Sequence, residues 1–401
     1  MSTAHGPRVA ILSAVRTPIG KLGGSLKELS AVTLGTVAVR AALERAALPA
    51  SEVPLLVMGH GIHAGTGQNP ARQVAMGVGV PKMSEEYTVN MVCGSGMQAL
   101  RTAFHEIRGG EVPLAVAGGM ESMSSAPFLT SNRARWGFRL GTQELEDSIM
   151  RDSLLDAYGE HEPMGLTGER IARKFNLTRT DVDVFSLRSH REAARAVADG
   201  TFDAELVPVP PGLVRGNEGL AKDEGPRGST TIEGLAKLRP AFRPDGILTA
   251  GNSSQIADGA AALVLASESE VERRGAKPLA WIHSTAAGGV DPSDVMEAPI
   301  PTVRAHLARV GLTAAEMDRF EHNEAFSSAS IAVQRSFDIP DSKFNVHGGA
   351  VALGHPIGDS GARIVVTLVH ELRRSRGHYG LATLCMGGGN GLSMILESSA
   401  A

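Results

Sequence analysis

The sequence predicts an α/β protein, on the basis of three observations. Short apolar runs typical of buried strands alternate with segments of helical periodicity over the first 120 residues. Glycine is abundant, with 47 of 401 residues, and aromatic residues make up only 4%, a composition that suits many tight strand-to-helix turns. The alternation returns near residue 258 after a more polar stretch. This order favours a largely parallel sheet covered by helices on both faces.

The first part of the chain contains four strand patterns and two helix patterns. Strands are expected at 9–15, within 53–65, at 87–92 and at 113–119. A helix is expected within 28–48, with Ser30 as its cap. The next helix has an apolar face and ends at glycines 109 and 110; the face comprises Met97, Leu100, Phe104 and Ile107.

The middle of the chain, residues 122–250, is richer in charge, arginine and proline. Helices are expected at 167–177 and 178–200, the latter capped by Thr178 or Thr180, and 208–231 is expected to be extended loop. We interpret this segment as an insertion that forms a lid or ligand-binding loop. The predicted domains are therefore a first α/β half at 1–121 plus 251–275, an inserted loop domain at 122–250, and a second half at 276–401.

The second half repeats the α/β character. Helices are expected at 299–312, 328–337 and 359–377, and two strands flank a glycine-rich turn within 379–398. Each half places a cysteine beside glycines at a strand end, which is compatible with a duplicated fold.

Bulk properties exclude several classes of function. The net charge of −4 and the lack of a Lys/Arg-rich block argue against nucleic-acid binding. No apolar run approaches the roughly 18 residues that span a bilayer, no secretory leader is recognisable, and "ESSAA" is not a peroxisomal address, so we expect a cytoplasmic protein without membrane insertion. The two cysteines are expected to be free thiols.

Cys93 lies in "NMVCGSGMQAL", between a strand pattern and a helix pattern. The unpaired N–H groups and the dipole of a helix N-terminus favour a thiolate there, and small neighbours would let a substrate carbonyl reach the sulfur. A small buried thiol at a tight turn is an equally good interpretation of this stretch alone.

Three further residues are candidates for chemistry. Pro356 forces His355 into extended backbone before a helix expected to start near Asp359 or Ser360, where the imidazole could deprotonate a thiol. Cys385 precedes glycines 387–389, so it could act as an acid or base beside amides that bind an oxyanion. Asn323 could orient a water molecule, although it could equally be a helix cap. Taken singly, His355 could be a plain loop histidine and Cys385 a buried strand residue.

Other sites that use these residue types fit less well. A zinc site would need CxxC or HxxxH spacing, so we expect no metal. A cysteine protease would need only one Cys–His pair, and no GxSxG elbow is present. The glycines after Cys385 lack the spacing of a phosphate-binding loop.

Taken together, these segments resemble the thiolase family over essentially the whole chain. The matching motifs appear in the family's order: "VCGSGMQAL", "GGMESMS", "NEAF", "GGAVALGHPIGDSGARI" and "CMGGGNG". "RTPIGKLGGSL" and "GILTAGNSSQIADGAAA" also match. The resemblance implies a five-layer αβαβα fold with two similar α/β halves and an inserted loop domain.

The resemblance also implies a reaction. Thiolases interconvert two acyl-CoA molecules with a 3-ketoacyl-CoA and CoA by a ping-pong route. Cys93 would carry the acyl group, His355 would activate it, and Asn323 would hold a water molecule. Cys385 would move the α-proton, and the N–H groups of Cys93 and Gly387 would form the oxyanion hole. The one motif His, the Asn and the second Cys differ from decarboxylating ketosynthases, which typically use two His with one Cys.

Coenzyme A is expected as substrate and product, with no separate cofactor. Arg227 would contact its adenine-nucleotide end and Ser254 its pantetheine. The tunnel would be lined by Leu238, Phe242, Ala250, Met164 and Phe326. Pro163 before Met164, and Gly234 where a Ser often stands, lean toward 3-ketoacyl-CoA thiolases of fatty acid β-oxidation, with acetoacetyl-CoA thiolase close behind. A homodimer or homotetramer is expected. The alternatives are a ketosynthase-like condensing enzyme and a non-catalytic acyl-CoA or lipid carrier.

Overall fold

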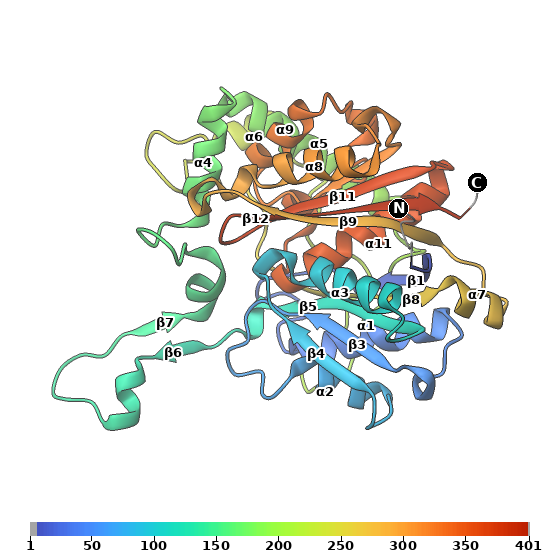
Figure 1. The fold of residues 1–401 in the computed structure, drawn as a ribbon. Coiled ribbons are helices and arrows are strands. Elements are labelled where there is room, and N and C mark those ends of the chain that lie inside the picture. The colour runs from blue at the N-terminus through green and yellow to red at the C-terminus, as the bar shows by residue number, and fades with distance from the viewer. Residues whose placement is uncertain (1–5, 400–401) are drawn as a thin grey trace.

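One large mixed sheet organises the chain. The computed structural model describes residues 6–399, and its main sheet has the strand order β10-β11-β12-β9-β1-β8-β5-β3-β4, with β2 beside β8 (Figure 1). Its strands are β1 (Val9–Arg16), β2 (Gly20–Lys21), β3 (Leu55–Gly59), β4 (Glu85–Val89), β5 (Leu114–Ser122), β8 (Ala257–Ser267), β9 (Ala280–Gly289), β10 (Arg319–His322), β11 (Tyr379–Met386) and β12 (Asn390–Ser398). A separate hairpin pairs β6 (Phe128–Thr130) with β7 (Leu145–Asp147).

The prediction of a largely parallel sheet is wrong. Only β3 with β4, β3 with β5 and β10 with β11 are parallel among the described pairs, and the others are antiparallel. The reason lies in the connections. A tight turn joins β11 to β12, so these strands must run in opposite directions, whereas parallel neighbours need a longer crossover.

Helices form three layers around the two halves of this sheet. They are α1 (Ala31–Arg45), α2 (Pro70–Val78), α3 (Ser95–Gly109), α4 (Met164–Lys174), α5 (Arg179–Ala198), α6 (Ile232–Ala236), α7 (Glu268–Arg274), α8 (Pro299–Val310), α9 (Ser327–Ser336), α10 (Ala350–Leu353) and α11 (Ile357–Ser375). Figure 1 shows α3 and α11 between the halves, α1 and α2 below the first half, and α8 and α9 above the second. This is the expected αβαβα layering.

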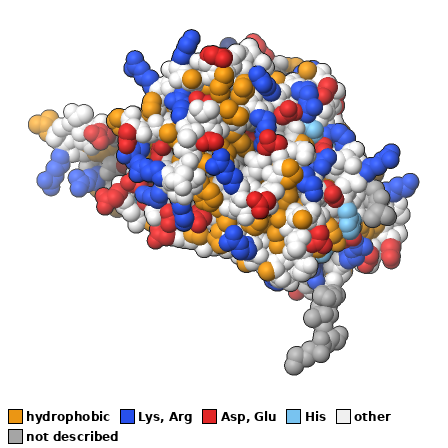
Figure 2. Space-filling view, turned by 90° about the horizontal axis from the view of Figure 1, so that it is seen from above, with side chains coloured by type: hydrophobic (Ala, Val, Ile, Leu, Met, Phe, Trp, Pro, Cys, Tyr) orange, Lys and Arg blue, Asp and Glu red, His pale blue; other side chains and the backbone are white. Residues whose placement is uncertain are grey.

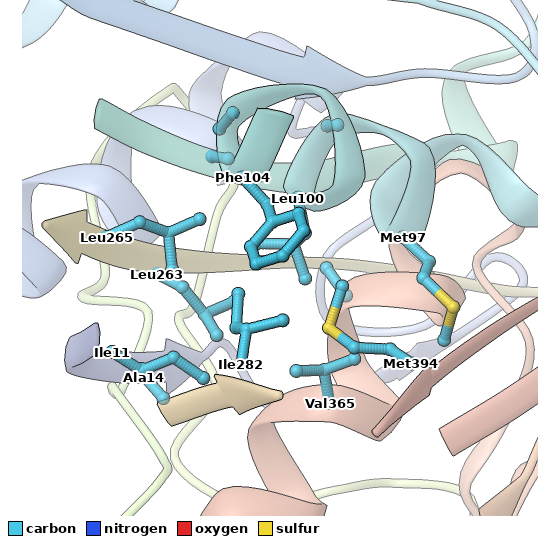
Figure 3. Close-up of a cluster of buried hydrophobic side chains, with 14 of the residues drawn as sticks. Ile11, Ala14, Met97, Leu100, Phe104, Leu263, Leu265, Ile282, Val365 and Met394 are labelled. Carbon is cyan, nitrogen blue, oxygen red and sulfur yellow. The ribbon is translucent and has the colours of Figure 1, made fainter. Parts of the chain in front are cut away.

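Apolar side chains from both halves meet at the central layer. Figure 3 shows them converging from β1, β8, β9 and β12 onto α3 and α11; the labelled residues are Ile11, Ala14, Met97, Leu100, Phe104, Leu263, Leu265, Ile282, Val365 and Met394. All are buried, and a fully buried side chain of this kind contributes about 1.5–3 kcal/mol of transfer free energy. The middle layer is therefore a shared core that fixes α3 and α11 against each other.

The two halves repeat one topology. The order β4-β3-β5-β8-β1 in the first half matches the order β10-β11-β12-β9 in the second, where Phe344 forms an isolated parallel bridge beside β10. In this match α3 corresponds to α11, so Cys93 and His355 occupy equivalent places before the two central helices. Cys385 instead lies at the end of β11. The duplication thus relates a cysteine to a histidine, and the two cysteines are not equivalent.

Most predicted elements are present. Ser30 accepts a hydrogen bond from the Thr33 N–H, and Thr178 forms a reciprocal capping box with Asp181. Gly110 ends α3 in the left-handed conformation. The strand expected at 87–92 ends at Val89, because the Asn90 side chain turns the chain by binding the Gly61 oxygen and the Val92 N–H. The proposed domain boundaries stay predictions.

The inserted segment carries a projecting arm. Figure 1 shows β6 and β7 extending away from the layers, and the loop between them exposes the large apolar side chains of Trp136 and Leu140. Residues 208–231 contain no helix and no strand of the described sheets, as expected. Acidic and basic side chains are interspersed over the face seen in Figure 2. No helix within residues 6–399 has the length and apolar character needed to span a membrane.

Candidate active site

Cys93 lies in a short 3-10 turn, Val92–Gly94, between β4 and α3. Ser95 fixes this turn, since its Oγ accepts the Met91 N–H at 2.9 Å and donates to the Val92 oxygen at 2.7 Å. Val92 has φ +49°, a strained value for a β-branched residue. A Cβ on Gly94 would lie 1.8 Å from the Met386 sulfur, so any larger residue there would have to displace the buried Met386 side chain. The thiol is therefore presented on a rigid turn.

Burial raises the pKa of the Cys93 thiol to about 12, and hydrogen bonds from the backbone N–H groups of Gly387 and Cys93 itself lower it only partly. The residue as a whole is half-buried. The cost of burying a charge thus opposes the effect of the helix N-terminus, and the expected thiolate stays a prediction. A thiol with a raised pKa would need a base before it could act as a nucleophile.

His355 is held as a neutral base. Its backbone N–H donates to the Gln255 oxygen at 2.8 Å, and its Nδ1 lies 2.6 Å from Ser360 Oγ. Because Ser360 Oγ–H donates to the Pro356 oxygen at 2.9 Å, Oγ accepts from Nδ1–H, which leaves Nε2 as the acceptor nitrogen. Burial, and next the Arg363 charge, lower the pKa of His355 to about 3. The helix begins at Ile357, two to three residues earlier than expected.

Asn323 faces His355 from the end of β10. Its Nδ2 lies 3.4 Å from His355 Nε2, and its Oδ1 is buried without a hydrogen-bond partner among the described residues. The alternative of a helix cap does not hold, because α9 begins at Ser327 with Phe326 in the cap position. A buried amide oxygen without a partner is costly, so Oδ1 is suited to bind a water molecule or a substrate group.

Cys385 is buried at the end of β11 and is electrostatically coupled to Cys93. Burial, and next the neighbouring Cys93, raise its pKa to about 12. Its Sγ donates to the Met296 sulfur at 3.6 Å. Gly388 and Gly389 take left-handed backbone conformations in the turn that follows, which orients the Gly387 N–H toward Cys93. Two free thiols with raised pKa values thus share one site.

The residues predicted for coenzyme A fall into two neighbouring groups. Arg227 is exposed, and its Nη2 lies 3.4 Å from Oε1 of Gln255, which follows the half-buried Ser254. The second group is apolar. The rings of Phe242 and Phe326 meet edge to face at 5.7 Å, Met164 packs in the same cluster, and Leu238 and Ala250 are exposed.

Sequence reasoning missed several residues that position this site. The backbone oxygen of Gln255 accepts the His355 N–H, and its side chain contacts Arg227. Gln255 therefore links a predicted catalytic residue to a residue predicted to contact coenzyme A. Ser360 sets the imidazole tautomer, and its signal was its place five residues after His355. Glu121, inside "GGMESMS", is fully buried against the same loops. Among the described residues, no three His, Cys, Asp or Glu side chains are grouped to hold a metal ion.

A thiol, an imidazole and amide donors at the junction of two α/β halves are the groups that acyl transfer through a cysteine requires. Residues 9–269 match the family model "Thiolase, N-terminal domain", and residues 276–398 match "Thiolase, C-terminal domain". The chain belongs to the thiolase family. The predicted family, fold and enzyme class are confirmed.

Named relatives agree with this assignment. "Acetyl-CoA acetyltransferase" of Escherichia coli (strain K12) is 45% identical over 96% of this chain and 98% of its own. The crystal structure of the Bacillus anthracis acetyl-CoA acetyltransferase is 40% identical, with TM-score 0.95 over 99% of this chain and 100% of that chain. Human mitochondrial 3-ketoacyl-CoA thiolase in complex with CoA is 39% identical, with TM-score 0.93 over 98% of both chains. The roles of individual residues stay predictions.

Proposed function

We propose that this thiolase transfers acyl groups between acetyl-CoA or another acyl-CoA and 3-ketoacyl-CoA, in either direction, through an acyl-thioester on Cys93. The observation that carries the proposal is the chain from the Pro356 oxygen through Ser360 to His355, which leaves Nε2 as an acceptor. The solved relative in complex with CoA supports coenzyme A as the carrier.

In the first half-reaction, His355 Nε2 accepts the Cys93 proton and the sulfur attacks the thioester carbon of an acyl-CoA. The N–H groups of Cys93 and Gly387 bind the oxygen that gains negative charge. When the tetrahedral intermediate collapses, the carbon–sulfur bond to CoA breaks, and the CoA thiolate takes the proton from His355. A thioester exchanges readily with a thiol, so the acyl group stays activated on the enzyme.

In the second half-reaction, condensation needs a carbanion on an acetyl-CoA. His355 Nε2 accepts the Cys385 proton, and the resulting Cys385 thiolate removes an α-proton, while the protonated His355 and a water molecule on Asn323 stabilise the enolate oxygen. The carbanion attacks the acyl carbon, the bond to Cys93 breaks, and the Cys93 thiolate takes the proton from His355. The product is a 3-ketoacyl-CoA. Thiolysis is the reverse, in which the Cys385 thiol protonates the departing carbanion.

A decisive experiment is intact-mass spectrometry after addition of acetyl-CoA. We expect a mass gain of one acetyl group at Cys93, and we expect Cys93→Ala to abolish both acetylation and thiolysis. A Cys93→Ala enzyme that still cleaves 3-ketoacyl-CoA would overturn the mechanism. The same experiment tests a non-catalytic carrier, which would gain no acetyl group. Activity retained after dialysis against a chelator would agree with the proposed lack of a metal or further cofactor.

The substrate we favour is a 3-ketoacyl-CoA longer than acetoacetyl-CoA, as in fatty acid β-oxidation, in a cytoplasmic enzyme. Pro163 before Met164, and Gly234 in α6, support this preference. Faster thiolysis of longer 3-ketoacyl-CoA substrates is expected, and equal or slower rates than with acetoacetyl-CoA would favour an acetyl-CoA acetyltransferase. Decarboxylation of malonyl thioesters would instead indicate a ketosynthase.

We propose that the chain forms a homodimer or homotetramer. Support comes from β4, an edge strand of the main sheet, and from the projecting arm with Trp136 and Leu140 exposed. Light scattering on the whole chain measures the oligomeric state. Removing residues 131–144 should convert a tetramer to a dimer, and an unchanged mass would exclude the arm as a contact.

A further inference from the structure

Glu121 at the end of β5 contacts two segments of the candidate site at once, the loop after β3 and the start of α11. Its Oε2 accepts the N–H of Gly61 at 2.8 Å and the N–H of Gly358 at 2.9 Å. Its Oε1 lies 3.0 Å from His60 Nε2 and 3.4 Å from the Ile62 nitrogen. The three backbone N–H groups are donors, and both oxygens of the side chain accept from them. Glu121 is 0% exposed, so none of these bonds competes with solvent.

Each of these contacts leads to a residue with a proposed chemical role. Gly358 follows His355 by three residues, within the first turn of α11. The oxygen of Gly61 accepts the Asn90 side-chain N–H at 2.8 Å, and Asn90 in turn holds the Val92 N–H next to Cys93. One carboxylate therefore spans the segment that carries the base and the segment that carries the nucleophile.

The close approach of these segments depends on this bridge. A Cβ on Gly358 would lie 2.8 Å from the Gly61 nitrogen, so the two loops touch with no side chain between them. Both N–H groups point at the same oxygen of Glu121, and neither has another partner within its loop. Without the carboxylate, two buried donors would be left facing each other, and they would separate to reach water.

We propose that Glu121 is a positioning residue for thioester formation: its carboxylate clamps the loop after β3 and the start of α11, and thereby sets the distance between His355 and Cys93. This inference rests on the proposed roles of those two residues. The clamp touches neither substrate nor reacting atoms.

Glu121 also contributes a negative charge to the site. That charge raises the pKa of Cys93, although burial is the larger cause. The other groups that face Glu121 are His60 and His63 after β3, Asp258 on β8 and Asp359 on α11. Among them only His60 lies within hydrogen-bond distance of the Glu121 side chain, whose other partners among the described residues are backbone amides and not a guanidinium or ammonium group.

Two substitutions separate the clamp from the charge. Glu121→Asp keeps the charge but shortens the side chain by one methylene, so the bonds to Gly61 and Gly358 are lost. Glu121→Gln keeps the length, and its amide oxygen can still accept both N–H groups, but the charge is gone. Glu371→Gln is the matched control, because Glu371 is a buried carboxylate on the same helix α11, bonded to His347, Arg319 and Arg374.

Two rate measurements distinguish these variants. Single-turnover acetylation of Cys93 by acetyl-CoA, followed by intact mass, should slow about 10- to 100-fold in Glu121→Asp, with KM for acetyl-CoA unchanged. Alkylation of Cys93 by iodoacetamide between pH 7 and 10 should be about threefold faster or more at each pH in Glu121→Gln, because a lost negative charge favours the thiolate. Glu121→Asp should keep the wild-type alkylation profile.

Acetylation of Glu121→Asp within twofold of wild type would overturn the clamp, and so would an equal slowing in Glu371→Gln. Unchanged alkylation of Glu121→Gln at every pH would overturn the electrostatic part. Failure of the proposed function is distinguishable, since wild-type protein would then not be acetylated at all, whereas alkylation of Cys93 still reports on Glu121. The melting temperature of each variant shows whether it is folded. Glu121→Gln is isosteric with the wild type, so it is the variant expected to remain folded.

Discussion

Replacing Ser360 by Ala tests the proposed role of His355 most directly. Ser360 is 1% exposed, and its Oγ is the partner of His355 Nδ1 at 2.6 Å. In Ser360→Ala the Nδ1–H loses its acceptor in a buried place. The imidazole can then move its proton to Nε2, which turns the base into a donor that cannot accept the Cys93 proton.

The size of the effect follows from the lost hydrogen bond. Leaving a buried donor without its partner costs about 1–3 kcal/mol, and this is the amount by which the productive tautomer loses its advantage. Since about 1.4 kcal/mol corresponds to a factor of ten, acetylation of Cys93 should slow about 5- to 150-fold. KM for acetyl-CoA should change little, because Ser360 is not among the residues predicted to contact CoA.

The assay is the rate of Cys93 acetylation in a single turnover, followed by intact mass. Ser375→Ala is the control, because Ser375 on the same helix also donates to the backbone oxygen four residues earlier, at 2.8 Å, but touches no histidine. If Ser360→Ala acetylates as fast as Ser375→Ala, the tautomer argument is wrong.

Three other predictions follow from the structure. In Gly119→Ala, the new Cβ would lie 2.2 Å from the Gly358 oxygen, so α11 must shift; stability should fall by about 1–3 kcal/mol in urea unfolding, and kcat should fall with it. The pKa of His306 is lowered to about 3 by burial, so the unfolded chain binds a proton there first, and stability is lost as pH falls below about 6.5. His306→Gln should therefore lose about 2 kcal/mol less than wild type between pH 7 and pH 5. Arg227→Ala should raise KM for CoA about tenfold at constant kcat, as expected for one charge-assisted phosphate contact.

Each of these has a contradicting result. Wild-type stability of Gly119→Ala would mean that α11 adapts without cost. If His306→Gln loses as much unfolding free energy as wild type between pH 7 and pH 5, the proton is taken up by another buried histidine. An unchanged KM in Arg227→Ala would remove that residue from the CoA site.

Local signals in the sequence were reliable where the physics is local. The capping box at Thr178, the left-handed Gly110 and the apolar face of α3 all follow from neighbours within a few residues, and all are present. The family motifs also pointed to Cys93, His355, Asn323 and Cys385, and the structure shows Asn323 beside His355 and Gly387 beside Cys93.

The features that could not be predicted from the sequence depend on long-range packing. The direction of β8 beside β1 and β5 is set by the path of the chain after the inserted segment. The hydrophobic periodicity of β8 itself does not predict this direction. The pKa of Cys93 depends on how deeply the thiol is buried, which a helix N-terminus alone does not reveal. The motif around Glu121 did not indicate a role for it, because its partners Gly61 and Gly358 lie about 60 and 240 positions away in the sequence.

The pairing of β1 has a consequence for how the chain folds during synthesis. β1 is made before β8 and β9, yet Val9 lies opposite Ser267 on β8 and Ile282 on β9. β5 can pair with β3, but it lacks its second neighbour until β8 is made. A nascent chain that has not reached Ala257 therefore holds apolar strands with open edges, which are prone to aggregate and which chaperones recognise. Folding of both halves is expected to wait for the same late strands.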